Sequence, residues 1–239
     1  MPEFVNLETR KPLMANSSYP LGWFSLLKIY FGLFVCVIIY NLLLNAALTH
    51  DPVGYDQQVK DTYGIGFLVL ILIGPFCEEV AFRLPLAKFN LKWVMLAVSF
   101  WISYAVTFII NKGLKIAPFL NEILFQYLFL IGLAAILFLL MLGLKIKFSA
   151  LELLWDRKFN TVFYAVSAIF ALTHFRAHYL NLEFGFVIAV LYLIPTFMFS
   201  VATSFIRVRN GFVSSLIFHI AFNLPFSLRY LQYLTASDR

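Results

Sequence analysis

Charged residues are scarce in this chain. They make up 13% of its 239 residues, whereas 62% of the residues are hydrophobic and the mean hydropathy is +0.87. Because soluble domains are roughly a quarter charged, this composition excludes an ordinary soluble domain and favours a polytopic membrane protein. Cysteine is also scarce. Cys36 and Cys77 both fall within apolar segments, which excludes a disulfide framework.

Signals for secretion, repetition and nucleic-acid binding are missing as well. Residues 1–19 are polar and contain no apolar core followed by small residues, so no cleaved signal peptide is expected. No internal repeat is visible, whereas many transporters are built from repeats. The net charge of +6 does not indicate a nucleic-acid partner, because the basic residues flank apolar runs, where they set orientation in a bilayer.

Long apolar runs are what the chain does contain. They predict an all-α fold, a polytopic transmembrane helix bundle of about seven spans. The spans are expected at residues 21–48, 64–86, 92–111, 122–144, 159–178, 184–206 and 211–232. We expect a cytoplasmic N-terminal segment at 1–20, a helical membrane domain at 21–232 and a C-terminal tail at 233–239. Pro75 and Pro195 are expected to kink their spans, with neighbouring helices taking up the freed carbonyl groups.

Lysine and arginine set the expected orientation. When the N-terminus is placed in the cytoplasm, most of the basic residues fall in cytoplasmic segments. The chain is therefore expected to be a multi-pass protein of a cell membrane, with the lipid bilayer as its surroundings. The lack of organelle signals points to a bacterial inner membrane.

Polar side chains occur at membrane depth in three of the predicted spans. They are Glu78, Glu79 and Arg83 in the second span, His174 in the fifth, and His219 and Asn223 in the seventh. An unpaired charge in hydrocarbon costs several kcal/mol, so such groups face the bundle interior and one another. We expect these three helices to meet at a polar intramembrane cavity.

Helix geometry suggests different roles for the two adjacent glutamates. Glu79 precedes Arg83 by four residues, which places both on one helix face as a favourable ion pair. Glu78 is rotated by about 100° from Glu79 and is therefore less readily neutralised. Glu78 is thus the candidate for chemistry. The Glu79–Arg83 pair is interpreted as structural, fixing helix register.

The two histidine motifs each allow two interpretations. His219 and Asn223 share a face and can donate hydrogen bonds to a developing oxyanion, or they can hold the bundle together through an interhelical hydrogen bond. Phe170 lies one turn before His174 and is expected to pack beside it. His174 is either a functional group or a satisfied core histidine. By the predicted span limits it lies about 10 Å nearer the outer side than Glu78 and His219.

A metal site is disfavoured by the same motifs. His174 and His178 share a helix face, but the stretch HFRAH lacks the glutamate that follows the first histidine in the zinc-peptidase motif HExxH. We therefore expect no metal ligand among these residues and no cofactor.

Three motifs together resemble a known family. EEVAFR at 78–83 fits EExxxR, FALTH at 170–174 fits FxxxH, and HIAFN at 219–223 fits HxxxN. In this order and in apolar spans, they resemble the CPBP intramembrane proteases. That family contains the type II CAAX prenyl endopeptidases and the bacteriocin-processing Abi proteins. The resemblance covers roughly residues 64–232, and no motif position departs from the pattern.

The resemblance implies a metal-independent glutamic endopeptidase that cuts a peptide or protein at the membrane. By motif position, Glu78 and His174 would activate a water molecule, and His219 and Asn223 would form the oxyanion hole. The supporting residues would be Glu79, Arg83 and Phe170. Two other functions stay open. One is a non-catalytic bacteriocin-immunity or scaffold protein of the same fold. The other is a proton-coupled transporter, which the missing repeat disfavours.

Overall fold

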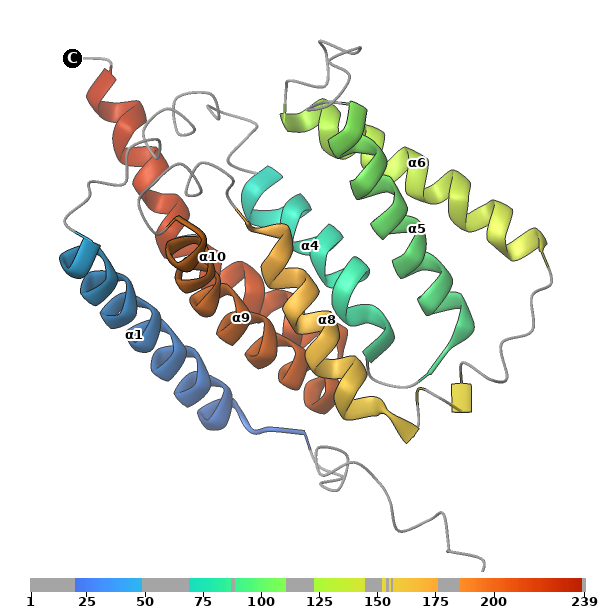
Figure 1. Cartoon of the computed structure of the whole chain (residues 1–239), viewed down its shortest axis with the longest axis horizontal. Helices are drawn as coiled ribbons and strands as arrows, with labels where there is room; N and C mark the ends of the chain where they lie inside the picture. Colours follow the sequence, from blue (N-terminus) through green and yellow to red (C-terminus); the bar gives the residue numbers. More distant parts are fainter. Residues whose placement is uncertain are drawn as a thin grey trace, which may run out of the picture.

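The computed structural model describes residues 20–48, 69–86, 89–110, 123–144, 152–153, 155, 157–175 and 185–237. Within these ranges all regular secondary structure is helical, so the expected all-α class is confirmed. The elements are α1 (Trp23–Leu48), a composite helix (Val69–Leu86) that contains α4 (Gly74–Glu78), α5 (Leu91–Phe108), α6 (Ile123–Gly143), α8 (Phe159–Thr173), α9 (Gly185–Asn210) and α10 (Phe212–Ser237) (Figure 1).

Every predicted span contains one of these helices, but several limits differ. The fifth helix ends at Thr173 instead of continuing to residue 178, and α9 continues to Asn210. At the C-terminal end, α10 continues beyond the predicted seventh span to Ser237. The predicted N-terminal segment up to residue 19, the start of the second span, and His178 lie outside the described residues.

Three of the described helices are long and apolar enough to cross a membrane by length and composition. Their windows are Trp23–Leu44, Leu124–Gly143 and Gly185–Asn210. Shorter apolar helices occupy Leu91–Thr107, Phe159–Thr173 and Phe212–Pro225. Large apolar side chains also point outward, with Trp23 78% and Phe24 81% exposed on α1. A large exposed apolar surface of this kind marks a molecule that contacts lipid or another apolar partner.

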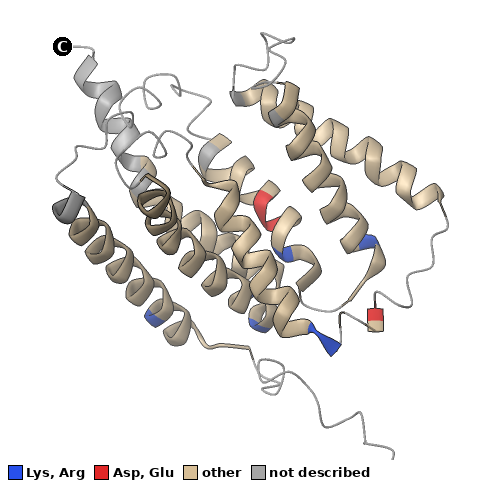
Figure 2. Ribbon diagram, in the orientation of Figure 1, with Lys and Arg blue, Asp and Glu red and all other residues tan. Residues whose placement is uncertain are grey.

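The composite helix lies in the middle of the bundle, between the α5–α6 pair and the group of α8, α9 and α10 (Figure 1). Its side chains are mostly buried, among them Cys77, Val80, Ala81 and Phe82. Its acidic and basic residues therefore sit centrally, whereas most other lysines and arginines of the described residues gather at the end of the bundle where α1 begins (Figure 2).

The backbone of the composite helix is irregular around Pro75. A π-helix (Val69–Ile73) precedes α4, and a second π-helix (Glu79–Arg83) and a 3₁₀ turn (Leu84–Leu86) follow it. Proline has no N–H to donate to the preceding turn, so the helix must adjust there. π-Turns are uncommon and are frequent at functional sites. Glu79 and Arg83 lie within the second one.

Two tyrosines of α1 compensate for prolines inside other helices. Pro195 in α9 cannot donate to the Leu191 carbonyl, and the Tyr40 hydroxyl donates to that oxygen at 3.0 Å. Pro225 in α10 leaves the Ala221 carbonyl open in the same way. There the Tyr30 hydroxyl donates at 3.0 Å.

The expected uptake of a freed carbonyl by a neighbouring helix is therefore confirmed for Pro195. It also occurs at Pro225. In both cases a phenol hydroxyl replaces the missing backbone donor.

A single residue joins α9 to α10. Gly211 has a φ of +91°, a left-handed conformation that glycine adopts without a steric cost. The turn packs the start of α10 against the end of α9. Asn210 at this corner pairs with the backbone of Leu21, donating to its carbonyl at 2.9 Å and accepting from its N–H at 3.2 Å.

Candidate functional site

Glu79 and Arg83 form a buried ion pair. Both side chains have 0% exposure, and Arg83 Nη1 donates to Glu79 Oε1 at 2.7 Å. The pairing expected from their spacing is confirmed. Arg83 also donates from Nη2 to the Ser200 hydroxyl of α9 at 3.3 Å, and its Cζ lies 4.2 Å from the centre of the Phe170 ring of α8. The cation–π contact and the hydrogen bond tie the pair to two further helices.

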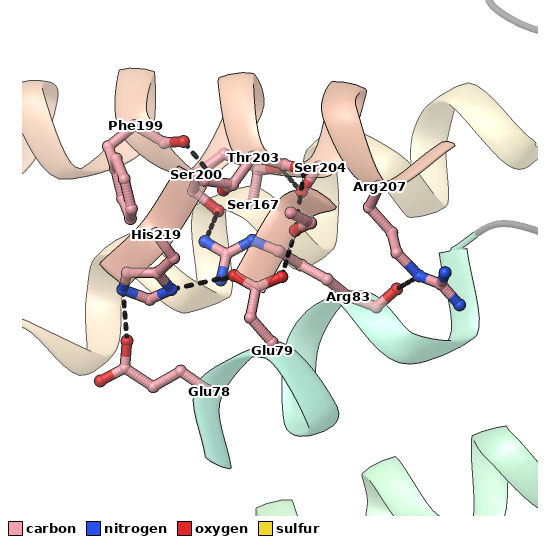
Figure 3. A network of polar contacts seen from close by, with 11 residues as sticks. Glu78, Glu79, Arg83, Ser167, Phe199, Ser200, Thr203, Ser204, Arg207 and His219 are labelled. Atoms are coloured by element: carbon pink, nitrogen blue, oxygen red, sulfur yellow. Dashed lines mark hydrogen bonds and ion pairs between the residues drawn. The ribbon is translucent and has the colours of Figure 1, made fainter. Parts of the chain in front are cut away.

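Glu79 is also bound from α10. Ser215 donates its hydroxyl to Glu79 Oε2. His219 Nδ1 lies 2.9 Å from Glu79 Oε1 (Figure 3). Together with Arg83, these groups supply three donors to one fully buried carboxylate. Such complete pairing is what a buried charge requires. Glu79 therefore uses both carboxylate oxygens in contacts that hold the composite helix against α10.

Glu78 is much less occupied than its neighbour. Its side chain is 21% exposed, and its Oε2 atom lies 3.5 Å from His219 Nε2. Among the described residues this is its one polar contact. The difference between the two glutamates follows from the helix, which points consecutive side chains in directions about 100° apart. Glu78 keeps a carboxylate that can accept a proton or a ligand.

His219 stands between the two carboxylates and is only 2% exposed. A carboxylate accepts hydrogen bonds, so Nδ1 carries the proton that faces Glu79. Nε2 then faces Glu78 either as a lone pair or, in the imidazolium form, as a second donor. Glu78 and His219 Nε2 can therefore share one exchangeable proton. The ring packs edge-on against Phe199, with centroids 4.8 Å apart.

Asn223 lies one turn beyond His219 on α10 and is partly buried. It makes no hydrogen bond with any other described residue. The interpretation of His219 and Asn223 as a hydrogen-bonded pair between helices therefore does not apply to Asn223. His219 does bridge two helices, but through the glutamates.

His174 is placed differently from the other candidates. It follows the last residue of α8 and is exposed, so it is not a satisfied core histidine. Its Nδ1 atom lies 3.0 Å from the Phe170 carbonyl oxygen, and its ring lies 4.7 Å from the Phe170 ring.

The expected packing of Phe170 beside His174 is thus confirmed. The Phe170 ring also lies 6.3 Å from the His219 ring. Phe170 therefore links His174 to the network, and no polar contact joins His174 to Glu78 among the described residues.

Several polar residues of this network were not predicted from the sequence, among them Ser215 and Arg207. Ser215 lies one turn before His219 on the same face of α10, so the spacing SxxxHxxxN contained the signal. Arg207 of α9 donates to the carbonyls of Arg83 at 3.1 Å and Leu84 at 2.9 Å. It therefore pairs carbonyls at the end of the composite helix, which such an end leaves without intrahelical partners. No local sequence pattern predicts that contact.

No group of three or more histidine, cysteine, aspartate or glutamate side chains is arranged to hold a metal ion within the part of the chain that the structure describes. His178, the possible second ligand beside His174, lies outside that part. The buried charges instead balance through Arg83 and, when it is protonated, His219. The arrangement can carry out proton transfer and donate hydrogen bonds.

Comparison with known proteins gives a distant relative. A segment of 76 residues is 33% identical to the uncharacterized protein YybC of Bacillus subtilis (strain 168), and it covers 29% of this chain and 44% of that protein. The chain therefore matches less than half the length of this relative. No protein-family model and no solved structure matches the chain. These comparisons leave its function to be inferred from the chemistry of the site.

Proposed function

We propose that this chain is an integral-membrane endopeptidase similar to the CPBP proteases, with Glu78 as the base that activates water. The observation that carries the proposal is the difference between two adjacent carboxylates. Glu79 is fully buried and accepts from Arg83, Ser215 and His219, whereas Glu78 is 21% exposed beside His219 Nε2. A structural ion pair needs one glutamate. The second carboxylate, partly exposed and next to an imidazole, suits general-base chemistry.

The proposed reaction consumes one water molecule. Glu78 takes a proton from the water while the water oxygen bonds to the scissile carbonyl carbon, giving a tetrahedral intermediate with a negative oxygen. The proton then passes to the amide nitrogen, the C–N bond breaks, and a carboxyl group and an amine are released. By the resemblance, His174 assists in orienting the water.

Donors on α10 support the negative oxygen in this proposal. While Glu78 is ionised, a protonated Nε2 of His219 faces it across the 3.5 Å contact. Once Glu78 has gained the proton from water, that N–H is released for the oxyanion. The amide of Asn223, which has no partner among the described residues, is the second donor. Preorganised donors of this kind supply a large part of the transition-state stabilisation in amide hydrolysis.

The membrane arrangement is part of the proposal. About seven spans would enclose a polar cavity around Glu78, with the N-terminus in the cytoplasm and the chain in a bacterial cell membrane. Three long apolar helices and a set of shorter apolar helices support this arrangement. So does the gathering of basic residues at the end where α1 begins (Figure 2).

A membrane scaffold or immunity protein is the second candidate. The observation in its favour is that His174, a proposed catalytic partner, is exposed and makes no polar contact with Glu78. Such a protein would need Glu79, Arg83 and Ser215 for folding but would not need the Glu78 carboxylate.

The test compares membrane peptides from cells that express wild-type protein, Glu78→Gln or the control Glu152→Gln. Glutamine keeps the shape of the Glu78 side chain but removes its basicity. Glu152 is exposed and lies outside the network, so its variant should behave as wild type. We expect cleavage products with wild type and Glu152→Gln only. Identical products from Glu78→Gln would contradict the proposal and favour a scaffold.

A further inference from the structure

The Ser215 hydroxyl is directed differently from other buried hydroxyls in these helices. Four of those others donate to the carbonyl one turn earlier in their own helix, at 2.8–3.0 Å: Ser99, Ser103, Ser167 and Thr203. Such a local bond is the usual choice of a serine or threonine inside a helix. Ser215 is also fully buried, but among the described residues its hydroxyl contacts Glu79 Oε2 of the composite helix and, at 3.3 Å, the Thr203 carbonyl of α9. Its contacts therefore join α10 to other helices.

The contact with Ser215 settles how the Glu79 carboxylate is turned. Glu79 Oε1 lies 2.7 Å from Arg83 Nη1 and 2.9 Å from His219 Nδ1, whereas Oε2 accepts from Ser215 (Figure 3). The last torsion of a glutamate side chain has broad minima, so the neighbouring donors decide its value. An arginine can pair with one carboxylate oxygen or with both. Ser215 holds Oε2 and thereby keeps Oε1 available to His219.

The orientation of Glu79 in turn decides which nitrogen of His219 carries a fixed proton. A carboxylate only accepts hydrogen bonds, so Nδ1 facing it is protonated whether the ring is neutral or cationic. Nε2 is then the nitrogen that gains or loses a proton, and it lies 3.5 Å from Glu78 Oε2. With Oε1 turned away, Nδ1 would lose its acceptor and a neutral ring would be free to carry its proton on either nitrogen.

We infer that Ser215 is a positioning residue for the reaction. By holding Oε2 of Glu79, it keeps a proton on Nδ1 of His219 and leaves Nε2 to change its protonation beside Glu78. The catalytic part of this inference rests on the proposed function. Ser215 acts through Glu79, and it has no contact with Glu78 among the described residues.

The first test reads the protonation of His219 directly. Purified protein in detergent is labelled with 15N in its histidine rings, and the ring nitrogen shifts are recorded over a range of pH. The chain has four histidines, and the His219 signals are those missing from His219→Gln. We expect a neutral ring with Nδ1–H in the wild type. In Ser215→Ala the same signals should report a mixture of the two tautomers.

The second test measures turnover of a peptide identified by the peptidome comparison. In Ser215→Ala, kcat per folded molecule should fall about tenfold, the effect of one lost charge-assisted hydrogen bond, while KM changes little. Ser215→Cys fills the same space with a weaker donor. It should change the tautomer and kcat in the same direction, and it replaces the alanine variant if that variant does not fold.

Two control variants make the outcome specific. Ser215→Thr keeps the hydroxyl and should retain both the wild-type tautomer and the wild-type kcat. Ser103→Ala removes a fully buried hydroxyl of α5 that donates within its own helix, to the Ser99 carbonyl at 2.8 Å. It should leave the His219 signals and kcat as they are in the wild type.

Unchanged His219 signals in Ser215→Ala, with a lower melting temperature, would overturn the inference and make Ser215 a structural residue only. A changed tautomer with an unchanged kcat would overturn it as well. Cleavage by Glu78→Gln at the wild-type rate would instead contradict the proposed function, whereas the nitrogen signals of His219 test the Ser215 contact without any turnover.

Discussion

The Nε2 atom of His219 lies 3.5 Å from Oε2 of Glu78. The other ring nitrogen lies 2.9 Å from Glu79 Oε1, so one imidazole spans two neighbouring carboxylates. Glu79 also accepts from Arg83 and Ser215, and Glu78 does not. His219 is thereby held in position by one glutamate while its other ring nitrogen faces the second. This relationship divides the roles of the two glutamates, and most of the predictions below depend on that division.

Loss of either member of the buried pair should harm folding more than loss of the Glu78 carboxylate. Glu79→Ala and Arg83→Ala each leave a charge unpaired at 0% exposure, which costs about 3–5 kcal/mol by soluble-protein precedent. Glu78→Gln should give a well-folded but inactive protein. Thermal unfolding in detergent and activity per folded molecule measure both effects. If Glu78→Gln unfolds the protein while Arg83→Ala keeps full activity, the two roles have been assigned the wrong way round.

Asn223→Ala should lower kcat without lowering stability. The side chain makes no hydrogen bond with any other described residue, so its removal breaks no hydrogen bond seen among them. A lost oxyanion donor costs about 10²–10³ in kcat. Asn223→Asp should be at least as damaging, since an ionised carboxylate repels the developing charge. Measuring kcat, KM and melting temperature on one preparation separates the possibilities. Normal turnover with a lower melting temperature would make Asn223 a structural residue.

The Tyr30 hydroxyl should stabilise the bundle only because Pro225 is present. Tyr30→Phe leaves the Ala221 carbonyl without its donor, at a cost of about 1–3 kcal/mol. In a Pro225→Ala background the backbone N–H of residue 225 can pair that carbonyl. The same tyrosine change should then cost much less. A double-mutant cycle on unfolding free energy measures this coupling. Equal costs in the two backgrounds would mean that the hydroxyl does not replace the missing backbone donor.

Peptidase activity should survive removal of metal ions. The proposed mechanism uses Glu78 as the base, and the stretch HFRAH lacks the glutamate of a zinc-peptidase motif. Purified protein treated with EDTA or phenanthroline should keep its rate, whereas Glu78→Gln should be inactive with or without added zinc. Complete loss of activity on chelation, restored by zinc, would make the histidines metal ligands.

Predictions that depend on local geometry agreed best with the structure. The Glu79–Arg83 pair was visible from spacing alone, because residues four apart on a helix face must lie close together. The same holds for Phe170 beside His174. Apolar runs predicted where the helices lie. Their ends were less predictable, and α8 stops at Thr173 while α10 continues to Ser237.

Contacts between distant segments could not be read from the sequence. Ser215 and His219 reach Glu79 only because Gly211 turns α10 back along α9 and both helices pack on the composite helix. Arg207 of α9 donates to the Arg83 carbonyl of the composite helix. Tyr40 of α1 donates to the Leu191 carbonyl of α9. Each of these contacts depends on the rotation and depth of two helices, which no local pattern specifies.

The sequence by itself determined the chemical groups, the all-helical class and the separation of Glu78 from Glu79 by about 100° around one helix. These properties follow from composition and from helical period. The tertiary structure alone decided which glutamate is enclosed. It added Ser215 and His219 to the Glu79–Arg83 pair and left Glu78 21% exposed. The physical reason is that a buried charge is tolerated only where packing from several helices supplies its partners.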